Sequence, residues 1–236
     1  MPFTTEKTPI FALLLAIAPF TIGSLTACSE VKLSSPTVSS SITPSGSATT
    51  APPKQDAAQM GHMNHGGMSM EMGTADAEYD LRFIDAMIPH HQGAIAMART
   101  AQQKSNRPEI KKLAEAIIQD QEKEIAQLQQ WRKQWYPNLS DRAMMWDSKA
   151  NKMMPMTPEY KQVMMMDMDL GSANAEFDLR FMNAMIPHHE GALLMAKEAQ
   201  TKTKRAEMQS LAKDILSSQQ AEIDEMKQWR KTWYNQ

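Results

Sequence analysis

The sequence predicts an all-α protein, a pseudo-symmetric four-helix bundle that is built from two repeated helical hairpins and preceded by a disordered N-terminal segment. The first observation is a duplication: residues 77–93 read AEYDLRFIDAMIPHHQG and residues 175–191 read AEFDLRFMNAMIPHHEG. The second is that the repeat continues at the same offset of 98 residues, without a gap, to the C-terminal end. The third is that apolar residues in each copy recur at spacings of three and four, the period of a helix with one buried face.

Each repeat predicts two helices joined by a short turn. In the first repeat, residues 75–137, one helix begins near Ala75, and a break near Ser105 precedes a second helix that ends before Pro137. In the second repeat, residues 173–235, the pattern predicts helices from Ala173 to Thr201 and from about Lys204 to Tyr234. One amphipathic hairpin cannot bury its apolar face alone, so we expect both to pack into one bundle over residues 75–236. Two separate hairpin domains are the alternative.

The connection between the repeats, residues 138–172, is rich in methionine. Thr157 and Pro158 are typical of the start of a short helix. Methionine fills irregular cores and also binds soft metals, so packing and metal capture remain equal alternatives here. The methionines concerned are Met144, Met145, Met153, Met154, Met156, Met164, Met165, Met166 and Met168.

The N-terminal region is not core material. Residues 10–23 are mostly apolar but too short to span a bilayer permanently, as in a secretory signal. The sequence LTAC that follows resembles a bacterial lipobox, so we expect residues 1–27 to be a lipoprotein-type signal peptide and Cys28 to be lipidated. An ordinary cleaved signal with an incidental cysteine is the alternative. Residues 28–74 are expected to form a flexible linker, rich in Ser, Thr and Pro, that ends in a Met/His-rich tract.

The composition favours soft-metal handling without thiols. The chain has 22 methionines but only one cysteine, so no internal disulfide can form. The net charge of −2 gives no basic face, which argues against nucleic acid as a partner. We expect an exported protein, periplasmic or associated with the outer membrane, that contacts a membrane only through a lipid anchor. Whether it stays anchored or is released is left open.

The repeated motif carries the candidate metal ligands. On a helix, Met87, His90 and Met97 form one stripe with His91 beside it, and Pro89 should bend or loosen this turn. Two imidazoles with thioethers suit copper, as Cu(I) or Cu(II), whereas zinc gains little from thioether. The alternative is that the histidines are polar core residues bonded to Asp or Gln across the bundle. The second copy offers Met185, His188, His189 and Met195.

The Met/His-rich tract is a second candidate for copper binding. Closely spaced ligands on a mobile segment give a high effective concentration and therefore weak, exchangeable capture. A low-complexity linker without metal is the alternative. The tract's candidate ligands are Met60, His62, Met63, His65, Met68, Met70 and Met72.

Other polar residues also recur at the offset of 98. Asp80 and Arg82 have their counterparts in Asp178 and Arg180, which indicates salt bridges within the bundle or an aspartate that orients an imidazole. Gln121 and Gln219 interrupt the apolar stripe of the second helix of each repeat. These amides either bond to the histidines or lie on a partly exposed stripe.

The segments DLRFIDAMIPHHQGAIAMA and DLRFMNAMIPHHEGALLMA resemble the ferritin-like "domain of unknown function 305" family, whose members repeat a helical MIPHHxGA motif. The resemblance covers about residues 75–236 and implies an all-helical bundle and a copper-binding protein of the cell envelope. Carried over by position, the family motif falls on Met87, His90 and His91, and on Met185, His188 and His189.

Together these observations predict a non-enzymatic copper-binding protein that sequesters or relays copper and contributes to copper resistance. Its expected partners are copper ions and other envelope copper-handling proteins. An oxidase on a ferritin-like bundle, dependent on copper or iron, is one alternative. Di-iron sites use Glu-x-x-His motifs, and no histidine here has Glu three positions before it, which counts against iron. A structural surface lipoprotein is the other alternative.

Overall fold

The computed structural model describes residue 70 and residues 72–236. The predictions for the signal peptide, for Cys28, for most of the linker and for five tract residues lie outside the described residues. Those five are Met60, His62, Met63, His65 and Met68.

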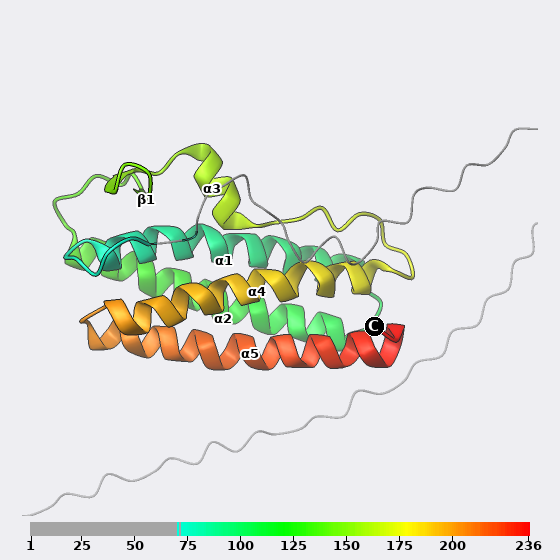
Figure 1. The fold of residues 1–236 in the computed structure, drawn as a ribbon. Coiled ribbons are helices and arrows are strands. Elements are labelled where there is room, and N and C mark those ends of the chain that lie inside the picture. The colour runs from blue at the N-terminus through cyan, green and yellow to red at the C-terminus, as the bar shows by residue number, and fades with distance from the viewer. Residues whose placement is uncertain (1–69, 71) are drawn as a thin grey trace, which may run out of the picture. The chain divides into compact units, whose positions relative to one another are not determined.

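The prediction of an all-α four-helix bundle is confirmed (Figure 1). Its long helices are α1 (Tyr79–Lys104), α2 (Pro108–Trp135), α4 (Phe177–Lys202) and α5 (Ala206–Tyr234). Helix α1 packs along α2 and α4 packs along α5, and the two hairpins meet where α1 packs against α4. Over residues 70 and 72–236, no helix is long and apolar enough to cross a membrane.

The apolar core is shared between the repeats, which decides against two separate hairpin domains. One cluster of buried side chains combines Phe83 and Met87 of α1 with Met195 of α4 and Met208 of α5. A second cluster combines Met97 of α1 with residues of α2, α4 and α5. Each hairpin therefore buries its apolar face against the other, as expected of amphipathic helices.

The helix boundaries follow local chemistry. Helix α1 begins at Tyr79, after the predicted Ala75, because the side chain of Asp76 accepts a hydrogen bond from the backbone of Glu78 and holds a turn there. The break at Ser105 is confirmed, and Pro108 opens α2, where its missing N–H costs nothing. Pro89 lies inside α1, which continues through it.

The connection contains the predicted short helix and a hairpin that the sequence did not predict. Helix α3 (Pro158–Met165) begins after Thr157, whose hydroxyl accepts a hydrogen bond from the backbone N–H of Tyr160 at 3.1 Å. Strands β1 (Met144–Asp147) and β2 (Lys152–Pro155) pair antiparallel. Figure 1 shows α3 and this hairpin beside α1.

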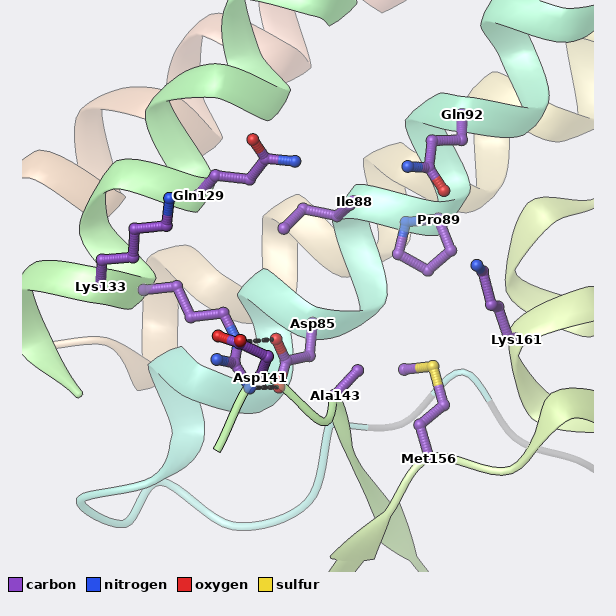
Figure 2. Close-up of a pocket in the computed structure, with 11 residues that line it drawn as sticks. Asp85, Ile88, Pro89, Gln92, Gln129, Lys133, Asp141, Ala143, Met156 and Lys161 are labelled. Carbon is purple, nitrogen blue, oxygen red and sulfur yellow. Dashed lines mark hydrogen bonds and ion pairs between the residues drawn. The ribbon is translucent and has the colours of Figure 1, made fainter. Parts of the chain in front are cut away.

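Asp85 anchors the hairpin to the bundle. Its carboxylate accepts hydrogen bonds from the guanidinium of Arg132, the shorter at 2.6 Å, and from the backbone N–H of Met144 at 2.7 Å. Asp85 and Arg132 line a cleft of about 470 Å³ between α1, α2 and the connection, and Figure 2 shows Asp85 among the residues around it. Because the second repeat has Asn183 in place of Asp85, this anchor belongs to the first repeat alone.

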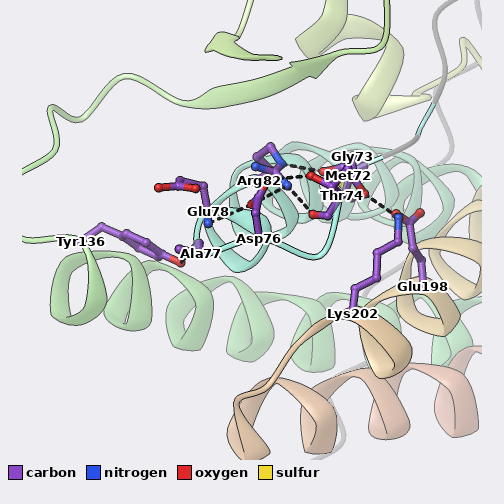
Figure 3. A network of polar contacts seen from close by, with 10 residues as sticks. All are labelled: Met72, Gly73, Thr74, Asp76, Ala77, Glu78, Arg82, Tyr136, Glu198 and Lys202. Carbon is purple, nitrogen blue, oxygen red and sulfur yellow. Dashed lines mark hydrogen bonds and ion pairs between the residues drawn. The ribbon is translucent and has the colours of Figure 1, made fainter. Parts of the chain in front are cut away.

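The packed region begins before residue 75, where the linker was expected to end. We call residues 72–76 the N-terminal strap. Met72 is 1% exposed, and the Arg82 side chain donates hydrogen bonds to the carbonyl oxygens of Met72 and Thr74 and pairs with Asp76 at 2.9 Å. The ammonium of Lys202 in α4 donates to the carbonyl of Gly73 (Figure 3). Charged donors therefore fix a segment that has little apolar surface of its own.

The strap has a counterpart in the second repeat. Arg180 donates to the carbonyl oxygens of Leu170 and Ser172, as Arg82 does to those of Met72 and Thr74. The equivalence follows the offset of 98 and extends upstream, where MSMEMGT of residues 68–74 matches MDMDLGS of residues 166–172. The duplicated unit is thus longer than the two helices that the sequence predicted.

Candidate metal centre

The four motif histidines lie together in the bundle core. Helix α1 supplies His90 and His91, α4 supplies His188 and His189, and each is at most 1% exposed. The rings of His90 and His188 meet across the α1–α4 interface with centroids 4.0 Å apart. Sequence reasoning placed one pair in each repeat, and the packing of α1 against α4 joins the two pairs.

The histidines form a polar layer between two apolar halves of the core. Along α1, the first apolar cluster ends at Met87 and the second begins at Ala94. Along α4, the order is reversed, because residues up to Ile186 belong mainly to the second cluster and Met195 belongs to the first. The histidine pairs lie at the changeover in both helices.

His91 and His189 face carboxylates from their own hairpins. The Nε2 atom of His91 lies 2.7 Å from Oε2 of Glu124 on α2, and Nε2 of His189 lies 2.7 Å from Oε2 of Glu222 on α5. Neither approach has the alignment of a hydrogen bond, so within the described residues both Nε2 atoms have a carboxylate at contact distance but no hydrogen-bond partner. The alternative of polar core histidines therefore holds in part for His91 and His189, with Glu as the partner in place of Asp or Gln.

His90 and His188 differ from each other although they are equivalent in the repeat. The Nε2 atom of His188 lies 3.1 Å from the carbonyl oxygen of Met165, which can only accept, so this nitrogen donates. Among residues 70 and 72–236, neither ring nitrogen of His90 has a hydrogen-bond partner. The contact with the Met165 carbonyl therefore distinguishes His188 from His90 within the described part of the chain.

Burial favours the neutral, metal-binding form of the His90, His188 and His189 imidazoles. Desolvation, followed by repulsion from neighbouring histidines, lowers the pKa of His188 and of His189 to about 3. The same causes hold the pKa of His90 well below its usual value. Desolvation and the nearby carboxylates of Asp120 and Glu124 raise the pKa of Glu222 to about 8.

The glutamates of the layer were missed by sequence reasoning. Glu124 and Glu222 are equivalent at the offset of 98, which is the signal that could have identified them. Gln121 and Gln219 lie one turn earlier and are 2% and 3% exposed, so they do not lie on a partly exposed stripe. They do not bond to the histidines either, because within the described residues the one motif-histidine ring nitrogen with a hydrogen-bond partner is Nε2 of His188, which contacts the carbonyl of Met165.

The predicted methionine ligands fall into three groups. Met87 and Met195 pack in the first apolar cluster, and Met97 and Met185 pack in the second. Their role as ligands stays a prediction. Met72 is buried in the first cluster as part of the strap, whereas Met70 is half-buried and lies beside His90.

The repeated Asp and Arg residues form salt bridges at the ends of the bundle. Asp80 pairs with Arg205 and Asp178 pairs with Arg107, each at 3.3 Å, so each aspartate ties one hairpin to the other. The salt-bridge interpretation is confirmed for the aspartates. The alternative, an aspartate that orients an imidazole, is wrong because these carboxylates pair with arginines instead.

The donor set favours a soft ion. Among residues 70 and 72–236, no group of three or more His, Cys, Asp or Glu side chains is placed to hold a metal ion. A site of the zinc or di-iron kind, which needs such a group, is therefore not assembled there. The donors in and around the layer are imidazoles, thioethers, backbone carbonyls and the carboxylates of Glu124 and Glu222, and the combination of imidazole with thioether suits copper.

Solved structures of CopM resemble the chain closely in sequence. CopM in its Cu(I)-bound form is 42% identical, with a TM-score of 0.52 over 66% of this chain and 97% of that one. The Cu(II)-bound form is 43% identical, with a TM-score of 0.53 over the same shares. An Ag-bound form obtained by soaking is 41% identical, with a TM-score of 0.52 and again the same coverage.

Two further comparisons are more limited. A DUF305 fragment from Deinococcus radiodurans is 24% identical, with a TM-score of 0.50 over 65% of this chain and 95% of that one, and supports the fold alone. The uncharacterized protein L153 of Acanthamoeba polyphaga mimivirus is 47% identical over 49 residues, 21% of this chain. The match spans about a third of that protein's length, 32%.

The family model described as "Domain of unknown function (DUF305)" matches residues 32–132 and again residues 80–230. The two overlapping matches cover both repeats, including the histidine pairs and the strap. The chain therefore belongs to the DUF305 family, as its duplicated MIPHH motif indicates.

Proposed function

We propose that this protein is a non-enzymatic copper-binding protein of the cell envelope, which sequesters or relays Cu(I) or Cu(II) and contributes to copper resistance. The observation that supports this most directly is His90, whose two ring nitrogens are buried and have no hydrogen-bond partner among the residues that the structure describes. A buried polar group left unpaired costs about 1–3 kcal/mol, and a bound ion would remove that cost. The neutral state of the buried rings at physiological pH suits them for this role.

The choice of copper rests on the donors and on the relatives. Imidazole and thioether together favour copper over zinc, magnesium or calcium. CopM, the similar protein, has been solved in Cu(I)-, Cu(II)- and Ag-bound forms. We propose that the histidine layer stores the ion, with His90, His91, His188 and His189 as its ligands.

We propose further that the chain is exported and exchanges copper with other envelope copper-handling proteins. The Met/His-rich tract that precedes the strap would act as the exchangeable acceptor, because its closely spaced ligands need no fold. Lipidation at Cys28 would hold the protein at a membrane, and this anchor would be its only membrane contact.

The decisive test removes the core imidazoles while keeping the fold. In His90→Gln/His188→Gln, glutamine keeps polarity at both positions, and circular dichroism verifies the helices. The variant should retain fewer Cu(I) ions than the unchanged chain after desalting under reducing conditions. The matched control, His62→Gln/His65→Gln, removes two imidazoles from the tract and should retain the core ions.

Unchanged copper stoichiometry in His90→Gln/His188→Gln would refute the core site. If the unchanged chain bound no Cu(I) at all, the result would favour the alternative of a structural surface lipoprotein. Sustained oxygen consumption by the copper-loaded protein in the presence of a reductant would indicate the oxidase alternative.

A further inference from the structure

A small space beside His90 is lined by groups from four segments. An ideal Cβ placed on Gly191 of α4 would lie 3.3 Å from Nε2 of His90, 3.3 Å from the methyl carbon of Met70 and 3.5 Å from the sulfur of Met166. Because position 191 is glycine, no Cβ fills this space. One imidazole nitrogen and two thioether groups therefore surround the same point.

The chemistry of this space fits a soft cation. His90 is fully buried, and within residues 70 and 72–236 its Nε2 has no hydrogen-bond partner, so a lone pair on this nitrogen can bind an ion in the neutral ring. Met70 and Met166 are half-buried, so an ion can reach their thioethers from solvent while His90 stays in the core. The two thioethers can close on an ion beside His90, because a methionine side chain has three rotatable bonds.

The two methionines are held in place by separate parts of the fold. Met70 lies two residues before Met72, the first residue of the strap, which Arg82 and Lys202 hold through hydrogen bonds to its carbonyl oxygens. Met166 ends α3 in the left-handed conformation, with φ of 45°, and its N–H bonds to the carbonyl of Gln162. The thioethers thus come from before and after the first hairpin and meet over His90.

The equivalent space in the other half of the bundle is closed. A Cβ on Gly93, the counterpart of Gly191, would overlap the backbone carbonyl of Met165. That same carbonyl accepts a hydrogen bond from Nε2 of His188, the counterpart of His90. Among the described residues, the atoms nearest to the added Cβ are therefore backbone atoms of the connection at Gly93 but side-chain atoms at Gly191.

We propose that Met70, Met166 and His90 form a site for Cu(I) or Ag(I) at the mouth of the histidine layer. This site rests on the proposed function and adds two details to it: the place where the ion leaves solvent and the thioethers that bind it there. Since the second half is blocked, entry is one-sided. The pair Met70 and Met166 performs the role that sequence reasoning assigned to Met87 and Met97.

Methyl NMR of the full-length chain, labelled with ¹³C at its methionine methyl groups, tests this site with Ag(I) as a redox-inert probe. Single Met→Leu variants assign the signals. We expect the Met70 and Met166 signals to shift together during the first equivalent of Ag(I). In Gly191→Ala, whose added methyl fills the space but removes no ligand, these shifts should need at least about tenfold more Ag(I).

Competition with a chromophoric Cu(I) chelator gives the second readout. Met70→Leu/Met166→Leu keeps the side-chain volumes and should weaken the tightest Cu(I) binding at least about tenfold. The matched control is Met168→Leu, because Met168 is the counterpart of Met70 at the offset of 98 but lies on the closed half. The control should bind as the unchanged chain does.

Stationary Met70 and Met166 signals in a chain that does bind Ag(I) would overturn this site while leaving the proposed function intact. Equal weakening by Met168→Leu would overturn it too. If neither Ag(I) nor Cu(I) bound the unchanged chain, the proposed function itself would fall.

Discussion

Acidification should destabilise the copper-free bundle. Burial lowers the pKa of His188 and His189 to about 3, from an ordinary value of 6.5, and lowers that of His90 as well. Between about pH 3 and 6.5, these histidines bind protons in the unfolded chain but not in the folded chain. The free energy of unfolding therefore falls as the pH drops below about 6.5. Glu222 acts in the opposite sense, because its pKa of about 8 makes the folded chain retain a proton between 4.5 and 8.

The magnitude follows from the balance of these groups. Between about pH 4.5 and 6.5, the unfolded chain binds about three more protons than the folded chain at the histidines and about one fewer at Glu222. The unfolded chain therefore binds about two more protons in total. Each proton is worth about 1.4 kcal/mol per pH unit, so the slope reaches at most about 3 kcal/mol per unit. Two such units are comparable with the whole stability of a small domain, about 5–15 kcal/mol. We therefore expect acid unfolding within this window.

Urea unfolding followed by circular dichroism measures the effect in metal-free buffer from about pH 7 to about pH 4.5. The midpoint should fall steeply below about pH 6, and His188→Gln/His189→Gln should flatten the fall because glutamine does not titrate. Excess Cu(I) should move the transition to lower pH by binding the folded state alone. A midpoint independent of pH, or a fall that the variant leaves unchanged, would refute the burial argument.

Two further predictions concern the contacts that make the halves unequal. Gly93→Ala should be less stable than Gly191→Ala by about 1–3 kcal/mol in thermal unfolding, because its new methyl overlaps the backbone carbonyl of Met165 rather than side-chain atoms. The gain in helix propensity is the same in both variants. Equal stabilities would show that α3 can move away from α1 at little cost. Arg82→Ala should release the strap, which loses two charge-assisted hydrogen bonds worth about 1.5–3 kcal/mol each, and hydrogen exchange of residues 72–76 should accelerate. The control Arg180→Ala should accelerate exchange near residue 170 instead. If residues 72–76 stayed protected in Arg82→Ala, Arg82 would not be what holds the strap.

The bundle could be predicted because its determinants are periodic and duplicated. The apolar spacing fixed which face of each helix is buried, and the duplication implied that the hairpins pack on one another. Thr157 and Pro158 likewise indicated α3, because capping depends on neighbouring residues. The hairpin of β1 and β2 was missed because its anchor, Asp85, lies far away in sequence.

The site was predicted only in part for the same reason. A helical wheel relates His90 to Met87 and Met97 on its own helix, but the atoms that approach His90 belong to α4 and to the segments around Met70 and Met166. Glu124 was overlooked because its relation to His91 appears only when α2 packs against α1. Spacing within one helix cannot reveal contacts that tertiary packing creates.

Duplication followed by local divergence explains how one motif yields two environments. If both repeats had identical surroundings, His90 and His188 would meet the same groups. They do not, because the carbonyl of Met165 lies against His188 and over Gly93, whereas among the described residues the side chains of Met70 and Met166 lie over Gly191, beside His90. Side chains can move aside for an ion more easily than a backbone carbonyl can. An ion at the proposed site would lie next to a histidine layer between two apolar halves of the core, where soft ligands are favoured over hydration.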